Sequence, residues 1–268
     1  MANYDPLSTL SWLVEAGADE AMGEMPVNRL VARQTAQAPA SIAKPVAARP
    51  APAVPPVAGD DIGSAMEIVA RCTTLAELKD ALEKFDGCAL KRQASNTVFA
   101  DGNPLSRIMV IGEAPGRDED RLGLPFVGRA GKLLDKMLAS IHLDRNAVYI
   151  TNVLPWRPPE NRNPEPGEVG VCMPFLRRHI ELVDPGILIL VGAVSVKSVL
   201  GLSDGIMKTR GRWLDYRVGS RTIPVMPTLH PAYLLRRPID KKLVWRDLQQ
   251  AESRIVELGL PASRARAT

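Results

Sequence analysis

This chain contains few cysteines and no long apolar run, and each absence excludes a class of protein. Only three cysteines occur in 268 residues, at Cys72, Cys88 and Cys172, and their odd number and wide spacing argue against a disulfide framework. The chain contains no stretch of about eighteen apolar residues and no basic segment leading into an apolar one at its start. We therefore expect neither a membrane span nor a secretory signal, and predict a cytoplasmic protein.

Three common signatures of cofactor chemistry are also missing. Residues 123–128 have the glycine spacing of a phosphate-binding loop, but Arg129 and Ala130 stand where lysine and a hydroxyl residue are needed. No GxGxxG motif follows any expected strand, which argues against a nicotinamide enzyme. The three histidines lie on separate expected elements without the close spacing of zinc ligands. An ATPase, a dehydrogenase and a zinc enzyme are therefore all disfavoured.

Charge is distributed unevenly along the chain. Residues 1–30 carry five acidic residues and one arginine, a sum of −4, so the remainder must carry +8 to give the net charge of +4. A basic body favours a polyanionic partner such as nucleic acid. Solvated surface charge is the alternative explanation.

Composition divides the chain into four parts. Residues 1–34 form an extension with a short amphipathic helix at 7–18, and residues 35–59 are an alanine- and proline-rich linker that cannot build a core. Residues 60–258 have globular composition, and residues 259–268 are expected to be a flexible tail. Within the globular part, Thr74 followed by Glu77 predicts a capping box that opens a helix.

Alternation of apolar runs with helical patterns predicts the fold class. Expected strands occupy residues 108–111, 148–153, 186–191 and 222–229, and expected helices occupy 130–141, 168–182 and 195–200. Continuous apolar strands that alternate with helices indicate a parallel sheet covered on both faces. We expect an α/β fold with three α/β/α layers and a central, mainly parallel four-stranded sheet.

Polar residues follow these strands where a ligand would bind. Glu113, Asn152 and His230 stand at expected strand ends, and Phe126 is an aromatic residue in a loop. Because ligands bind at the carboxyl edge of open parallel sheets, these groups suit a pocket that stacks a flat ring and reads its edge. The chemistry would be hydrolytic, with a carboxylate orienting water and an imidazole donating to a developing negative charge. Turn capping, loop bracing and core packing are the alternative roles.

The motifs GEAPG followed by ED, GLPFVGRAG, TNVLPWRPPENRNP and LHPAYLLRRP occur in this order within residues 74–248. In these motifs the chain closely resembles the family four uracil-DNA glycosylases. By this resemblance Glu113 would activate water and Phe126 would stack on uracil. Asn152 would read the pyrimidine edge, and His230 would stabilise the departing base.

The resemblance implies a DNA repair enzyme that flips uracil out of single- or double-stranded DNA and hydrolyses its N-glycosidic bond, leaving an abasic site. We expect a monomer whose catalytic domain is residues 60–258. Further substrate contacts would come from Gly112, Ala114, Pro115 and Gly116. DNA would be held by an apolar wedge of Leu234 and Leu235 beside two phosphate-binding residues, Arg236 and Arg237. Arg157 and Arg162 would bind further phosphates. A catalytically altered DNA-binding protein and a glycosylase for another deaminated base are the alternatives.

The chain differs from this family at the cysteine positions that usually bind an iron-sulfur cluster. At its four cysteine positions this chain has Phe85, Cys88, Trp156 and Cys172. Because such clusters need a full set of thiolates, we expect no cluster and no other cofactor, with the two aromatic residues as an apolar replacement. Recruitment of Cys72 as a third ligand is the alternative.

Overall fold

The computed structural model describes residues 59–260. The expected N-terminal extension, the linker except its last residue, and most of the expected tail lie outside the described residues. Within residues 59–260, no helix is both long enough and apolar enough to cross a bilayer.

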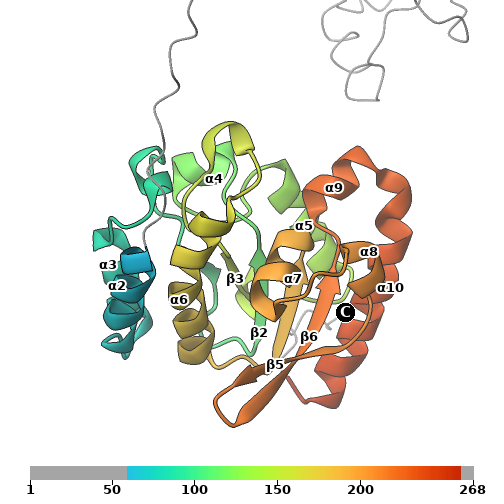
Figure 1. The fold of residues 1–268 in the computed structure, drawn as a ribbon. Coiled ribbons are helices and arrows are strands. Elements are labelled where there is room, and N and C mark those ends of the chain that lie inside the picture. The colour runs from blue at the N-terminus through green and yellow to red at the C-terminus, as the bar shows by residue number, and fades with distance from the viewer. Residues whose placement is uncertain (1–58, 261–268) are drawn as a thin grey trace, which may run out of the picture. The chain divides into compact units, whose positions relative to one another are not determined.

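A mixed six-stranded sheet forms the centre of the fold, in the order β1-β3-β2-β4-β6-β5 (Figure 1). The strands are β1 Asp101–Gly102, β2 Ile108–Gly112, β3 Tyr149–Asn152, β4 Ile187–Val191, β5 Leu214–Val218 and β6 Arg221–Thr228. The four expected strands are the central ones and pair in parallel. The expectation of a four-stranded sheet was wrong, because β1 and β5 add antiparallel edges. Short β1 and alternating, half-exposed β5 lack the continuous apolar run that identified the other strands.

The middle of the sheet is apolar on both faces. All five residues of β2 and all five of β4 are buried, and Val110 pairs with Ile150 on one side and Ile189 on the other. Such strands are stable only when both faces are covered, which requires helices above and below the sheet. The parallel register also brings Gly112 opposite Asn152, so two expected site segments end side by side.

Helices cover both faces of the sheet and complete the three layers (Figure 1). They are α2 Gly59–Ala70, α3 Leu75–Lys84, α4 Arg117–Leu122, α5 Arg129–Ala139, α6 Pro166–Val183, α7 Ala193–Leu200, α8 Ile206–Thr209, α9 Pro231–Arg236 and α10 Lys241–Glu257. One apolar core joins the sheet to α2, α3, α6 and α7, and a second joins it to α5, α9 and α10. The capping box at Thr74 and Glu77 is confirmed at the start of α3.

Asp247 on α10 is completely buried and ties this helix to the end of β6. Its Oδ2 accepts from Thr228 Oγ1 at 2.7 Å and from Arg210 Nε at 3.0 Å, and its Oδ1 accepts a second donation from Arg210. Burial raises the pKa of Asp247, although both partners oppose the rise. Thr228 is the last residue of β6, so this network fixes the strand end from which His230 follows.

We predict that Asp247→Ala lowers the free energy of unfolding by about 3 kcal/mol, because it leaves the guanidinium of Arg210 without its buried partner. Urea-induced unfolding measures the change. Asp215→Ala on exposed β5 is the matched control and should change stability by no more than about 0.5 kcal/mol. Equal effects of the two substitutions would contradict a stabilising role for the buried carboxylate.

Candidate active site

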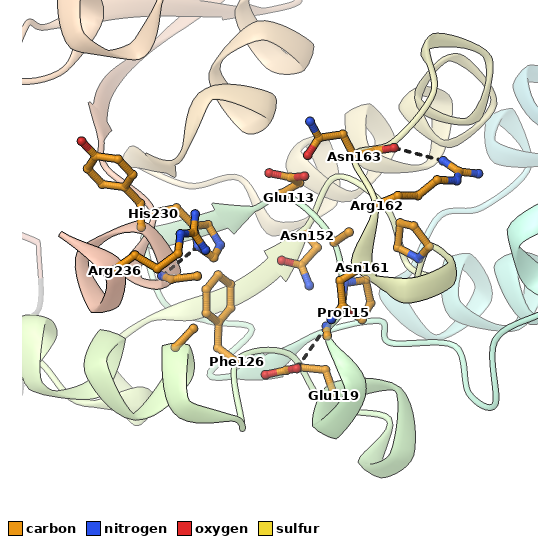
Figure 2. Close-up of a pocket in the computed structure, with 16 residues that line it drawn as sticks. Glu113, Pro115, Glu119, Phe126, Asn152, Asn161, Arg162, Asn163, His230 and Arg236 are labelled. Carbon is orange, nitrogen blue, oxygen red and sulfur yellow. Dashed lines mark hydrogen bonds between the residues drawn. The ribbon is translucent and has the colours of Figure 1, made fainter. Parts of the chain in front are cut away.

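A cavity of about 360 Å³ opens at the carboxyl edge of the parallel strands (Figure 2). Nine of the expected site residues line it, namely Glu113, Ala114, Pro115, Gly116, Phe126, Asn152, Arg162, His230 and Arg236. The other five expected residues, Gly112, Arg157, Leu234, Leu235 and Arg237, are not part of its lining. The strand ends therefore converge on one site, as open parallel sheets require.

Glu113 directly follows β2 and faces the cavity (Figure 2). Its backbone carbonyl accepts from Leu154 N at 3.0 Å, and the carbonyl of Gly112 accepts from Val153 N at 3.0 Å. These bonds extend the pairing of β2 and β3 beyond the sheet and fix the backbone below the side chain. No hydrogen bond within residues 59–260 engages the Glu113 carboxylate, and desolvation raises its pKa. A carboxylate held in this way has its oxygens free to accept a proton from water.

Asn152 ends β3 and is only 6% exposed. Its Oδ1 is buried and accepts no hydrogen bond from any residue that the structure describes. A buried acceptor without a donor costs about 1–3 kcal/mol, so natural structures leave one in place only with a reason. Asn152 lines the cavity, so a ligand with an N–H to donate is the expected partner, and this role stays a prediction.

Phe126 places its ring next to His230, with Asn152 nearby (Figure 2). The ring centroid lies 5.7 Å from that of His230, with an angle of 30° between the planes. A side chain on Gly112 would remove this arrangement, since its Cβ would lie 2.5 Å from the Phe126 ring and 2.4 Å from Asn152 Oδ1. Phe126 itself has a φ of +55°, in the left-handed region that costs a non-glycine residue about 1–3 kcal/mol. The ring position is therefore held by the surrounding structure.

His230 stands at the start of α9, where its Nδ1 accepts from Ala232 N at 3.1 Å. Burial, assisted by nearby Arg236, lowers the pKa of His230 to about 4, so the ring is neutral near pH 7. Because Nδ1 is an acceptor, the single proton of the neutral ring resides on Nε2. His230 can therefore donate one hydrogen bond into the cavity without carrying a positive charge.

Glu119 on α4 is a lining residue that sequence reasoning did not select. It is 9% exposed, and its Oε1 accepts from Val127 N at 3.0 Å and Gly128 N at 2.8 Å. Its Oε2 accepts from Gly116 N at 3.1 Å (Figure 2). One carboxylate thus ties the loop after β2 to the segment that follows Phe126, and the Gly116 N–H is not free to bind substrate. The acidic pair in the ED motif was the available signal.

The loop between β3 and α6 is braced by its own arginines. Arg162 forms a two-pronged ion pair with buried Glu168, at 2.9 and 2.5 Å, and Arg157 Nε donates to Asn161 Oδ1 at 2.8 Å. Glu160 and Asn161 both have left-handed backbones, which such bonds help to hold. Both guanidinium groups already have partners in the protein, so their expected contacts with DNA phosphates stay predictions.

The structure leaves only one of the two leucines of the expected apolar wedge exposed. Leu234 is 1% exposed and packs into the core beside α10, because it lies on the inner face of α9. It is therefore not available to enter DNA, and its assignment to the wedge was wrong. Leu235 is 38% exposed on the same helix, and Arg236 and Arg237 are exposed beside it. A wedge of one leucine with two flanking cations remains a prediction.

The four positions compared above with cluster ligands lie together in the core between the sheet and α6. Trp156 is 1% exposed and donates from Nε1 to Thr97 Oγ1 at 3.0 Å, and the Phe85 ring lies 5.1 Å from that of Phe175. A hydrogen bond with Cys88, together with burial, raises the pKa of the Cys172 thiol well above its usual value. Two thiols and two packed aromatic rings do not fit a cluster that needs four thiolates.

Comparison with known proteins agrees with this geometry. The family model of the uracil DNA glycosylase superfamily matches residues 99–249. A type-4 uracil-DNA glycosylase of Thermotoga maritima is 38% identical over 185 residues, 68% of this chain and 95% of that protein. Proteins of the same name from Sulfurisphaera tokodaii and Archaeoglobus fulgidus are 38% and 43% identical, over 66% and 56% of this chain and 83% and 78% of theirs.

We predict that the protein purified without oxygen is colourless, contains no stoichiometric iron, and is folded. Absorbance at roughly 400 nm measures the colour, and iron analysis measures the metal content. Stoichiometric iron, or unfolding when the protein is treated with a chelator, would show that the four positions hold a cluster after all.

The same arrangement predicts that Trp156→Ala lowers the free energy of unfolding by about 3–5 kcal/mol, the range for removing a large aromatic side chain from a core. The double substitution Cys88→Ser with Cys172→Ser is the matched control, since it removes both remaining thiols and keeps the aromatic packing. It should lower stability much less than Trp156→Ala in the same urea titration.

Proposed function

Since this chain belongs to the uracil DNA glycosylase superfamily, we propose that it hydrolyses the bond between uracil and deoxyribose in DNA, the first step of base excision repair. The observation that carries the proposal is the convergence of Glu113, Phe126, Asn152 and His230 on one cavity. These side chains supply a proton acceptor, a stacking surface, an edge reader and a proton donor. Hydrolysis needs the water-activating and charge-stabilising groups, and the other two would bind and select the base.

We infer that the uracil nucleotide is turned out of the DNA, because a base inside a duplex cannot reach a cavity at the end of a sheet. Flipping costs a few kcal/mol, and stacking of the base on Phe126 would return about 1–3 kcal/mol of it. Exposed Leu235 on α9 would occupy the space left in the stack, and Arg236 and Arg237 would bind flanking phosphates. We propose that the protein does this as a monomer, on single- or double-stranded DNA.

Selection of uracil is assigned to Asn152. Its unpartnered Oδ1 would accept from uracil N3–H, and its Nδ2 would donate to O4. Cytosine presents an acceptor at N3 and an amino donor at position 4, the reverse pattern. Cytosine would therefore leave the buried amide unpaired at both atoms, which rejects it more strongly than loss of a favourable contact would.

Hydrolysis follows from the two remaining groups. Glu113 would orient a water molecule and accept its proton as the oxygen bonds to C1′ of the sugar. The bond from C1′ to N1 breaks, its electron pair moves to the uracil ring, and an abasic site is left. His230 would donate from Nε2 to uracil O2, where the negative charge accumulates, and its low pKa keeps it a neutral donor. The uracil anion then takes a proton from solvent and Glu113 returns its proton to solvent, so the products are the abasic strand and uracil.

Incubation with a uracil-containing oligonucleotide, followed by alkali cleavage, is the direct test of the proposal. The expected result is strand cleavage at uracil and release of the free base. A hypoxanthine-containing strand tests the alternative of another deaminated base. Binding of DNA without release of any base would show instead a catalytically altered DNA-binding protein.

We predict that Glu113→Gln and His230→Ala each lower the single-turnover rate by about a hundredfold or more, the scale for positioned acid-base and charge-stabilising groups. In the unaltered protein the single-turnover rate should fall as the pH is lowered, because protonation of Glu113 removes the proton acceptor. The raised pKa of Glu113 moves this fall above the pH at which an exposed glutamate would titrate. The rate of Glu113→Gln should not show this fall as the pH is lowered. If the fall persists in this variant, another group is responsible for the titration.

We also predict that Asn152→Asp weakens uracil excision by about tenfold or more and permits slow release of cytosine. A carboxyl group at this position can accept from the cytosine amino group and, when protonated, donate to N3. Single-turnover rates on matched uracil and cytosine oligonucleotides measure both effects. Unchanged uracil kinetics would remove Asn152 from the role of edge reader.

A further inference from the structure

Arg145 binds the backbone of the segment that carries Phe126. It lies in the short helix Arg145–Ala147 before β3, 19 residues after Phe126. Its Nη2 donates to the carbonyl oxygen of Phe126, and its Nη1 donates to that of Pro125 at 3.2 Å. Arg145 is not part of the cavity lining, so it has no direct access to a bound base.

Two carboxylates fix the direction in which this guanidinium points. Asp135 on α5 accepts from Arg145 Nε at 2.8 Å, and Asp101 on β1 accepts from Nη1 at 2.5 Å. A guanidinium is planar and carries five N–H donors in a rigid fork, so binding on two sides leaves it no free rotation. The remaining donors are aimed at the two carbonyl groups. A lysine ammonium has no such fork and could not bind all four partners.

The carbonyl of Phe126 needs such a partner because of the backbone around it. Phe126 has its left-handed φ of +55°, and its carbonyl is packed so tightly against α5 that a Cβ on Gly131 would lie 1.7 Å from it. Relief of the positive φ requires rotation about the N–Cα bond of Phe126, which turns the peptide group that carries the Pro125 carbonyl relative to the Phe126 side chain. Arg145 binds the carbonyls on both sides of this bond, so it opposes such a rotation and the change in ring position that would accompany it.

We propose that Arg145 is a positioning residue for uracil excision, which holds the Phe126 ring in its stacking position by binding the Phe126 carbonyl. The inference rests on the proposed function, since it concerns the placement of the base in that reaction. It assigns Arg145 no contact with DNA or uracil. Its effect on catalysis must therefore pass entirely through Phe126, and this separates it from a general structural role.

A double-mutant cycle measures this dependence. Arg145→Gln, Phe126→Ala and the combined variant are compared with the unaltered protein in single-turnover excision of uracil at saturating enzyme. Arg145→Gln is expected to lower the rate constant about tenfold, because a shift of roughly 1 Å in a positioning group has effects of this order or larger. In the Phe126→Ala background the same substitution should lower the rate less than about twofold, since no ring remains to be positioned.

Arg145→Lys is the second variant and keeps the positive charge between the two aspartates. It should remain folded and still lose most of the activity that Arg145→Gln loses, because the carbonyl bonds need the fork. Arg254→Gln on α10 is the matched control, since it makes the same substitution at an arginine that pairs with exposed Glu257 and does not line the cavity. Arg254→Gln should change thermal stability little and leave the excision rate within about twofold.

The outcomes separate this inference from the proposed function. If the unaltered protein releases no uracil, the proposed function fails before Arg145 is tested. If it releases uracil and the losses from Arg145→Gln and Phe126→Ala multiply in the combined variant, Arg145 acts independently of the ring and the inference is wrong. A rate for Arg145→Lys equal to that of the unaltered protein would overturn it as well.

Discussion

The close approach of three chain segments at Gly112 is the constraint on which the site depends. A Cβ at this position would overlap both the ring of Phe126 and the amide of Asn152, so only glycine lets β2, β3 and the loop before α5 meet there. The contact brings the Phe126 ring and the Asn152 amide together, the two groups proposed to stack on and recognise one flat base. The proposed site therefore depends on all three segments keeping their positions.

Two buried carboxylates and one guanidinium hold this arrangement from outside. Glu119 binds the backbone on one side of Phe126 and Arg145 binds it on the other, while Asp247 fixes the end of β6 from which His230 follows. Because hydrogen bonds hold the charged groups of Glu119, Arg145 and Asp247, these three side chains form the rigid support of the site. Within residues 59–260 no hydrogen bond engages the Glu113 carboxylate, and Asn152 Oδ1 is buried without a donor. Under the proposed function, water and uracil would supply these partners.

The core beside α6 shows how packing can take the place of a covalent tie. Phe85 and Trp156 come from segments far apart in the chain and are both buried, together with Cys88 and Cys172. The same apolar core holds the segment after α3 and the loop after β3, with Phe85 packed against Phe175 and Trp156 bonded to Thr97. Neither aromatic residue lines the cavity, so this packing stabilises the scaffold without supplying a group to the proposed reaction.

Sequence by itself determined the parallel core of the sheet and the main residues that line the cavity, because buried strands have continuous apolar runs and the polar residues that follow them must meet at one edge. It missed β1 and β5, whose pairing depends on neighbours rather than on local pattern. Only the tertiary structure decided which side of α9 is buried, and so removed Leu234 from the wedge and left Leu235 exposed. It alone revealed Arg145 as a brace and showed which backbone groups the Glu119 of the ED motif binds, since no residue pattern encodes the positions of those backbone atoms.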